Sequence, residues 1–269
     1  MCHFASGVLT RFDVFYSDKS DSHTEILEEY GIGDFALLPG FVEFELIPPN
    51  DGDWDDLENW DFVVRQDRVP RWFNYIQDAS RARAMLSRCF PEGFKKGFSV
   101  MGNLNLERLT CLPDNIRISA GGNVNLGGLI SLPNNVKLSA GDSLYLGRVT
   151  SLSDNAELLA KGNLSLGSLS SLPNSIELSA GRNLNLKGLT SLPDNSKLSV
   201  GGNLNLGGLT SLPNNVKLSV RGDLYLGGLT SLPDNAELSA GNNLFLGIAM
   251  RGKKLPVGVK IEAGHVFYE

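Results

Sequence analysis

Residues 121–140 read GGNVNLGGLISLPNNVKLSA, and residues 201–220 repeat this stretch with only three changes. The same 20-residue unit begins at residue 101 and runs without insertion or deletion to about residue 247. It is present as seven full copies and the start of an eighth. A fixed period of this length is typical of a repeat protein in which each unit packs on its neighbours along one axis.

Two segments of each unit alternate apolar and polar residues, as strands with one buried face do. In the copy at 201–220 these segments are residues 204–206 and 216–220, and Gly-Gly and Pro-Asn-Asn stretches supply turns between them. Each unit therefore predicts one coil with two short strands. Equivalent strands would stack in parallel about 4.8 Å apart. We expect a mainly β fold, a right-handed parallel β-solenoid of about eight coils with a leucine-lined interior.

Asparagine recurs at the third and fifteenth positions of the unit, as in Asn123 and Asn135. Side-chain amides stacked at a fixed rise can bond to one another or cap turns, so these residues predict structural ladders along the rod. The fourteenth position alternates between Asp and Asn from coil to coil, which avoids stacking like charges.

The chain divides into regions of different charge. Residues 1–100 hold 18 acidic and 10 basic residues, a net of −8, whereas residues 101–269 hold 12 and 14, a net of +2. We expect an acidic α+β domain at 1–90 that also caps the solenoid, the repeat solenoid at 91–250, and a C-terminal capping segment at 251–269.

Strands and helices of the front domain follow from local patterns. Alternation predicts strands at 8–16, 41–47 and 61–66, and a capping box at 22–25 predicts a short helix that Gly31 could terminate. A second helix is expected at about 74–89, with one apolar face formed by Tyr75, Ile76, Ala79, Ala82 and Leu86.

Both ends of the array carry degenerate half-units. Residues 98–100 predict the second strand of a preceding half coil, and residues 255–264 match the second half of the unit after three inserted residues. Residues 265–269 predict a final, bulkier strand. These segments would cover the unpaired backbone that an open solenoid end exposes.

The Leu-x-Leu and Leu-x-x-Leu-Pro cadence resembles the leucine-rich repeats of bacterial effectors, whose unit is also about 20 residues. Those repeats place an Asn after the Leu-x-Leu strand and form a horseshoe. Here Gly-Gly stands in that stretch and a second clear strand follows. The departure favours a closed, two-sided β-solenoid.

The array together with the front-domain stretches at 42–49, 59–64 and 69–73 resembles small uncharacterised proteins of phages and prophages. This resemblance covers most of the chain. It implies a phage or mobile-element origin and transfers no catalytic residues.

The sequence shows no recognisable pattern of metal-ligating or disulfide-forming residues. Its three histidines and three cysteines lie far apart, without metal-ligand or disulfide spacing, so we expect no cofactor and no metal. The net charge of −6 argues against direct nucleic-acid binding, which relies on clustered Lys and Arg. With no long apolar run we expect no membrane contact and a cytoplasmic location in a host bacterial cell.

Two sets of residues are candidates for binding. An acidic, aromatic stretch of the front domain contributes Asp53, Trp54, Asp55, Asp56 and Trp60. Outward positions of the coils contribute three aromatic residues, of which the last two should stack on adjacent coils: Tyr145, Tyr225 and Phe245. Exposed aromatic side chains bury much area on contact at little entropic cost.

These features favour a non-catalytic protein-interaction module, encoded by a phage or mobile element, that binds or inhibits a host protein such as a defence factor. We expect a protein partner, and a homo-oligomer stays open. The alternatives are an enzyme with an unrecognised site in the front domain, or a structural phage component. No grouping of nucleophile, base and orienting residue supports the enzyme.

Overall fold

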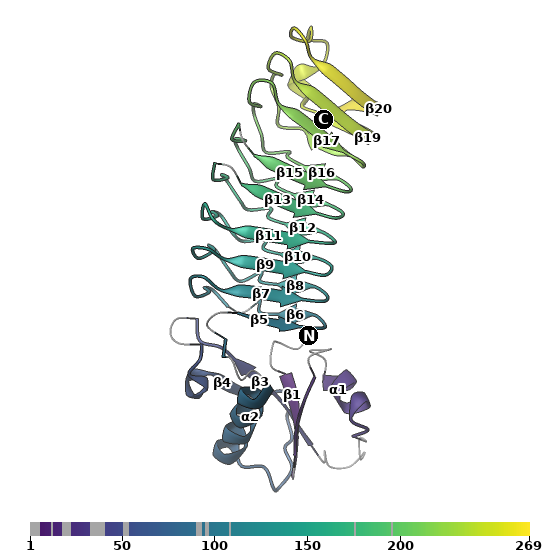
Figure 1. The fold of residues 1–269 in the computed structure, drawn as a ribbon. Helices are drawn as coiled ribbons and strands as arrows, with labels where there is room; N and C mark the ends of the chain where they lie inside the picture. Colours follow the sequence, from purple (N-terminus) through teal and green to yellow (C-terminus); the bar gives the residue numbers. More distant parts are fainter. Residues whose placement is uncertain are drawn as a thin grey trace.

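A rod of stacked coils stands on a small mixed domain in the computed structural model (Figure 1). The structure describes residues 6–11, 13–17, 23–32, 41–50, 54–89, 93–94, 97–107, 109–174, 176–194 and 196–269. The predicted fold class is confirmed: the chain is mainly β, with a parallel β-solenoid of about eight coils and a small N-terminal α+β region.

The front domain is a four-stranded antiparallel sheet in the order β2-β1-β3-β4. Its strands are β1 (Ser6–Thr10), β2 (Val14–Tyr16), β3 (Phe41–Ile47) and β4 (Asp61–Val64). The helices are α1 (His23–Glu29), α2 (Tyr75–Cys89) and the short 3-10 helix η1 (Leu57–Asn59). Gly31 follows α1 with a φ of +63°, as expected for a glycine that ends a helix.

Two predictions for this domain are wrong in detail. The single strand expected at 8–16 is a hairpin, because the Thr10 N–H donates to Asp13 O at 2.8 Å and turns the chain between β1 and β2. The apolar face of α2 is also rotated: Ile76 is 79% exposed and Tyr75 is exposed, whereas Asp78 and Met85 are buried. The Arg81 guanidinium pairs with the Asp78 carboxylate at 2.7 Å, which satisfies that buried charge.

The coils contribute two kinds of strand. Those at the fourth and fifth positions of the unit are β6 (Leu104–Asn105), β8 (Val124–Asn125), β10 (Leu144–Tyr145), β12 (Leu164–Ser165), β14 (Leu184–Asn185), β16 (Leu204–Asn205) and β18 (Leu224–Leu226). Those in the second half are β5 (Phe98–Val100), β7 (Arg117–Ala120), β9 (Lys137–Ala140), β11 (Glu157–Ala160), β13 (Glu177–Ala180), β15 (Lys197–Val200) and β17 (Lys217–Val220).

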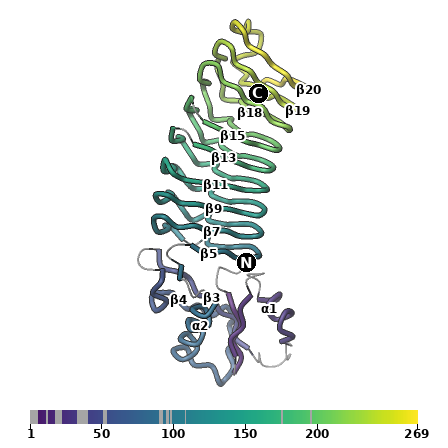
Figure 2. The backbone as a smooth tube through the Cα atoms, in the orientation of Figure 1, coloured from purple at the N-terminus to yellow at the C-terminus, as the bar shows by residue number. Residues whose placement is uncertain are grey.

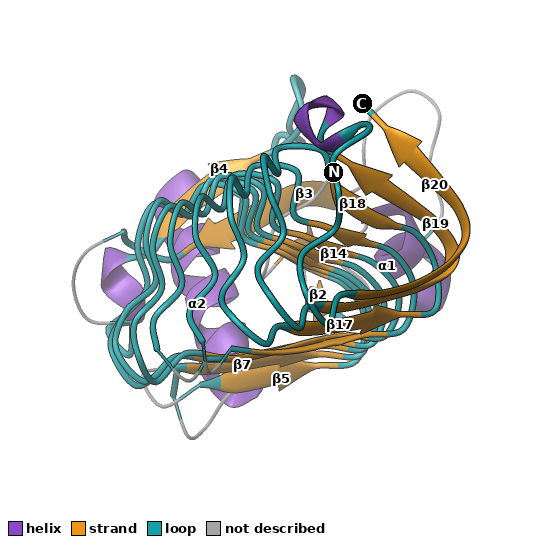
Figure 3. Cartoon of the chain, turned by 90° about the horizontal axis from the view of Figure 1, so that it is seen from above, coloured by secondary structure: helices purple, strands orange, loops and turns teal. Residues whose placement is uncertain are grey.

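Equivalent residues of successive coils pair in parallel at an offset of 20 residues, such as Leu144 with Leu164 and Leu158 with Leu178. The backbone follows the same path coil after coil (Figure 2). Seen along the rod, the two sets of strands form two faces and loops close the rest of each coil (Figure 3). The two parallel strands per coil are therefore confirmed.

Leucine columns fill the interior between the faces. Leu186, Leu206 and Leu226, at equivalent positions of three coils, are each 0% exposed. The coils approach so closely at the first position that a Cβ on Gly141 would lie 1.9 Å from the carbonyl oxygen of Gly121. Glycine at this corner therefore allows close contact without an unusual φ, although Lys161 and Arg221 hold the same position in two other coils.

The asparagine ladders form as expected. At the fifteenth position, Asn135 Nδ2 donates to Asn115 Oδ1 at 2.8 Å, and Asn155 Nδ2 donates to Asn135 Oδ1 at 3.0 Å. Asn115 and Asn135 have φ values of 64° and 55°, a left-handed conformation that asparagine tolerates better than most residues. The ladder therefore both shapes the turn and links the coils.

Strand pairing on one face of the rod is interrupted between β15 and β17, whereas β16 and β18 still pair on the other face. The six-stranded sheet ends at β15, whereas β17 pairs with β19 (Glu237–Leu246), a long strand that runs across both faces. Ser196 stands at the inward position that Ile176 and Val216 fill in adjacent coils, and its buried hydroxyl has no hydrogen-bond partner among the described residues. A polar group in an apolar column is unfavourable, and this is our explanation for the missing pairing between β15 and β17.

The two ends of the rod differ. At the N-terminal end, one continuous hydrophobic core joins the front domain to the first coils, with Trp60, Phe94 and Leu104 all buried. At the other end, the 3-10 helix η2 (Ile248–Met250) and a nine-residue strand β20 (Lys260–Tyr268) complete the chain. The second half of the segment predicted at 255–264 and most of the segment predicted at 265–269 thus join in β20, which pairs in parallel with β19.

Replacement of Leu206 by Ala should lower the free energy of unfolding by about 2–5 kcal/mol, because it opens a cavity in a stacked leucine column. Replacement of the outward Asn205 by Ala should cost less than about 1 kcal/mol. Urea unfolding followed by circular dichroism measures both. Equal losses would mean that the inward and outward faces are assigned wrongly.

Replacement of Ser196 by Val should raise the free energy of unfolding by about 1 kcal/mol, since it removes a buried unpaired hydroxyl and completes an apolar column. The matched control is Ser199→Val, at an outward position of the adjoining strand β15, which should change stability by less than about 0.5 kcal/mol. The same urea experiment tests both variants, and a destabilised Ser196→Val protein would contradict this explanation of the interrupted contact.

Candidate functional site

The predicted aromatic patch of the front domain is part of the core. Trp54 and Trp60 are each 1% exposed, and the Trp60 ring lies 4.9 Å from that of Phe94. The indole of Trp54 donates to Pro49 O at 3.0 Å, and that of Trp60 donates to Trp54 O at 3.1 Å. These two tryptophans support the base of the solenoid and present almost no surface to a partner.

The neighbouring carboxylates hold local structure. Asp55 accepts a hydrogen bond from the Phe94 N–H, and Asp56 accepts from the Glu58 N–H at 3.2 Å and from Asn59 Nδ2 at 2.9 Å. Asp56 thereby caps η1. Asp53, the remaining candidate of this group, lies outside the described residues. Exposed acidic charge is present here, but without the exposed aromatic rings that were expected beside it.

The predicted stacking of Tyr225 on Phe245 is present, with ring centroids 4.6 Å apart and an angle of 9° between the ring planes. Phe267 of β20 continues the column at 5.2 Å from Phe245. Tyr145 stands apart from this column, exposed between Asn125 and Ser165 of the adjacent strands. The outward aromatic residues thus form one three-ring column near the C-terminal end and one isolated ring.

Tyr225 also has a charged neighbour. Partial burial is the main factor that raises the pKa of its phenol above 10.0, and the nearby Asp223 carboxylate, which accepts a hydrogen bond from the phenol at 3.3 Å, raises the pKa further. The Glu269 carboxylate acts in the same direction. The column therefore presents a neutral phenol at physiological pH.

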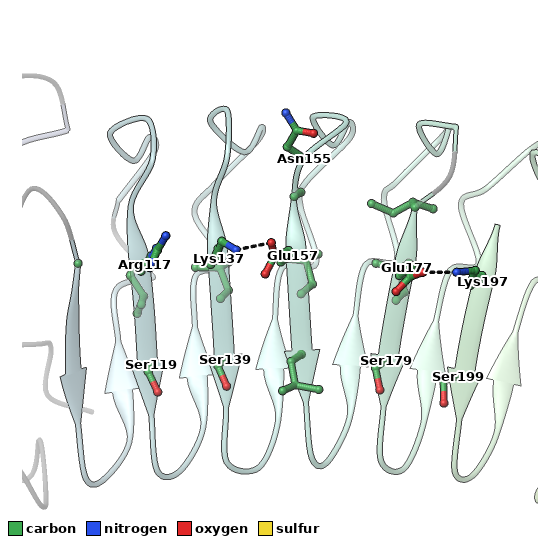
Figure 4. A pocket seen from close by; sticks show the side chains of 18 of the residues that line it. Arg117, Ser119, Lys137, Ser139, Asn155, Glu157, Glu177, Ser179, Lys197 and Ser199 are labelled. Carbon is green, nitrogen blue, oxygen red and sulfur yellow. Dashed lines mark hydrogen bonds and ion pairs between the residues drawn. The ribbon is translucent and has the colours of Figure 1, made fainter. Parts of the chain in front are cut away.

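A shallow groove runs over the outward face of the six-stranded sheet, across β7, β9, β11, β13 and β15 (Figure 4). Two rows of side chains line it. One is a serine row that includes Ser119, Ser139, Ser179 and Ser199, and the other is a charged row at the start of each strand. The groove is wide and open, a shape that suits an extended protein surface better than an enclosed small molecule.

The charged row contains both signs, and four of its members pair between coils. Lys137 pairs with Glu157, and Lys197 pairs with Glu177 (Figure 4). The hydrogen bond to Glu177 and its charge raise the pKa of the Lys197 ammonium. Paired charges of both signs leave no basic stripe of the kind that binds a nucleic-acid backbone.

One residue interrupts the serine row. Leu159 of β11 pairs with Ser139 on one side and Ser179 on the other, and it is 45% exposed. It therefore places an apolar side chain between two small polar ones within the groove. The sequence carries this signal, since every other full copy of the unit has Ser at the nineteenth position, but Leu159 was not among the predicted binding residues.

Two of the three histidines, His23 and His265, lie in the described part of the chain. His23 lies in α1, where its Nε2 is 3.0 Å from Phe44 O and its Nδ1 is 3.6 Å from a Glu43 carboxylate oxygen. His265 lies on β20 beside Phe267, far along the chain from His23. Within the described ranges, no cluster of three or more His, Cys, Asp or Glu side chains could hold a metal ion.

Searches of family models, of curated proteins and of solved structures gave no match for this chain. No helix in the described part of the chain has the length and apolar character needed to cross a membrane. The groove and the aromatic column are therefore the two features of this chain that point to a function.

Ultraviolet difference titration of the full chain against its Tyr225→Phe variant should show the Tyr225 phenol losing its proton above pH 10.0, its ordinary pKa. Asp223→Asn should bring that pKa down, because it removes a negative charge next to the phenolate. Since the folded-state pKa is the higher one, this group should lower stability as pH rises from 10.0 toward the folded-state value. An unchanged pKa in Asp223→Asn would contradict the assigned neighbour.

Proposed function

We propose that this chain is a non-catalytic scaffold that binds a protein partner along the groove of the six-stranded sheet. The observation that carries the proposal is Leu159, the exposed apolar residue in a row of serines. A contact of this kind, with one apolar anchor surrounded by polar groups, is how protein interfaces concentrate their affinity.

The surroundings of Leu159 support a protein rather than another ligand. Serine hydroxyls on both sides can donate or accept hydrogen bonds, and the paired charges of Lys137 and Glu157 lie at the groove rim. A rigid parallel sheet holds these groups at a fixed spacing, so little conformational entropy is lost when a partner binds.

The resemblance to small phage and prophage proteins supports a bacterial host protein as the partner. On this proposal the chain acts in the host cytoplasm, where it binds or inhibits a host factor such as a defence protein. Inhibition by a rigid scaffold needs only that the bound partner's own working surface is covered.

The test is affinity capture from bacterial lysate with quantitative mass spectrometry, using the full chain and its Leu159→Ser variant. The variant restores the serine row without touching the core, and it should reduce recovery of the partner about tenfold or more through loss of one buried leucine contact. Circular dichroism should show an unchanged thermal transition.

Tyr145→Ser is the matched control. It also replaces an exposed residue by the residue at the same position of the adjacent coil, here Ser165, but it lies on the other face of the rod. A protein lost with Leu159→Ser and retained with Tyr145→Ser supports the groove. Capture that survives Leu159→Ser and disappears with Tyr145→Ser or Phe245→Ser would overturn it in favour of the opposite face.

A further inference from the structure

The C-terminal end of the rod is unusually apolar. Of the fourteen large hydrophobic side chains that are exposed among the described residues, six lie within residues 248–269. They are Ile248, Leu255, Val257, Val266, Phe267 and Tyr268. An exposed apolar cluster of this size in a short segment indicates a contact surface.

The backbone of the same end is also unpaired. Within the described part of the chain, β20 has β19 as its one partner strand, so the other edge of this nine-residue strand is open. The N-terminal end differs, because the front domain packs against it through Trp60 and Phe94. Long open edges are sites for strand addition unless something covers them.

The directions of the backbone groups in β20 follow from two hydrogen bonds. The Lys260 N–H donates to Ala236 O at 2.8 Å, and the Glu269 N–H donates to Leu246 O at 3.0 Å, so both residues direct their groups toward the preceding coil. Because this direction alternates along a strand, four residues direct N–H and C=O toward the open edge: Ile261, Ala263, Val266 and Tyr268.

These four residues also share a side-chain direction. Each pairs with an inward residue of β19: Leu238, Ala240, Leu244 and Leu246, respectively. Their side chains therefore continue the interior columns of the solenoid, and no further coil in the described part of the chain covers them. β20 is thus an interior layer that is left at the surface.

The order of these residues is symmetric about the corner of the strand. Consider two copies of β20 paired antiparallel, with Ile261 of one copy opposite Tyr268 of the other. Ala263 then lies opposite Val266. The same two pairs recur on the other side of the corner with the copies exchanged. Inward residues face inward residues, and the backbone groups of both copies point at each other, as hydrogen-bonded antiparallel pairs require. A one-residue slip would place inward residues against outward ones.

We propose that two copies of this chain join end to end through antiparallel pairing of β20 with β20, on a twofold axis that passes between Gly264 and His265 at the corner of the strand. β19 and β20 bend around this corner (Figure 3). A half-turn about the line that bisects the bend places the first half of β20 in one copy over the second half of β20 in the other copy. The interface is isologous, the commonest arrangement of homodimers.

Charge complementarity supports a second copy as the occupant. Lys217 and Lys260 both pair with Glu237 at 3.0 Å, so the outward charges alternate in sign toward the end of the rod. In the proposed register Glu269 of the second copy lies next to Lys260 and continues the alternation of charge. The twofold axis repeats this contact at the other end of the interface. Opposite charges directly across a strand pair are favourable.

The closed dimer is also favoured over a growing fibre. Head-to-tail stacking would need the N-terminal end of the next copy, and the front domain covers that end. Twofold pairing uses the open β20 edge of both copies and leaves neither of these two edges for a third copy, whereas the groove around Leu159 stays accessible on each copy.

Sedimentation velocity over a range of concentrations tests the assembly. The full chain should sediment as a dimer of twice 29.1 kDa. Val266→Lys, which places a charge in the centre of the interface, should weaken the dimer at least about 100-fold. Ile130→Lys adds the same charge at an exposed site elsewhere and should leave the dimer intact. A monomer at all concentrations, or a dimer unaffected by Val266→Lys, would overturn the proposal.

Cysteine cross-linking tests the register without altering the interior columns. The proposed register places Glu262 directly opposite Phe267 of the second copy, in a pair without backbone hydrogen bonds, where Cα atoms are about 4.5 Å apart and a disulfide can form. In a background with the native cysteines replaced by serine, Glu262→Cys mixed with Phe267→Cys should form a cross-linked heterodimer on oxidation.

The control mixture is Glu262→Cys with His265→Cys, which is two residues out of register and should cross-link far less. Preferred cross-linking of the control mixture would overturn the register even if the chain is a dimer. Because both substituted side chains point outward from β20, the fold of the last coil should persist, which circular dichroism verifies.

Discussion

The stacking of each coil on an equivalent coil is the constraint on which the rest of the structure depends. Parallel pairing at an offset of 20 residues places every side chain over its counterpart, leucine on leucine and asparagine on asparagine. An apolar residue benefits from this arrangement in every coil, whereas a charge is repelled by its own copy. The outward charges change sign at several steps along the rod, as in Lys137 over Glu157 and Lys217 over Glu237, whereas Arg117 stands directly beside Lys137. Where an inward column receives a serine, at Ser196, the pairing fails.

The same constraint explains which parts of the fold the sequence could predict. A strict period repeats each signal seven times, so the strands, the asparagine ladders and the added strand at 98–100 were all predictable. The front domain contains no repeat, so each of its sequence signals occurs only once. There the hairpin after Thr10 depends on one local turn, and the inward face of α2 depends on Asp78 pairing with Arg81. Neither contact leaves a periodic signal.

The candidate site was predictable only in part. The stacking of Tyr225 on Phe245 follows from the repeat and is present. The burial of Trp54 and Trp60 depends on how the front domain packs against the first coil, which the composition of a short acidic stretch does not reveal. Leu159 was visible as a break in a serine column, but its meaning depends on the groove around it. On a repetitive surface, the residue that departs from the repeat is the one to examine for function.

Exact coil deletion tests the central claim most directly. Removal of residues 161–180 takes out one full period and brings Glu157 next to Lys197 in the charged row, so every column stays in register. Thermal unfolding of this variant, compared with one that lacks residues 161–179, separates register from length. We predict one cooperative transition close to that of the full chain for the 20-residue deletion and a strongly destabilised protein for the 19-residue deletion, because a one-residue slip turns inward side chains outward. Equal damage from the two deletions would contradict the account.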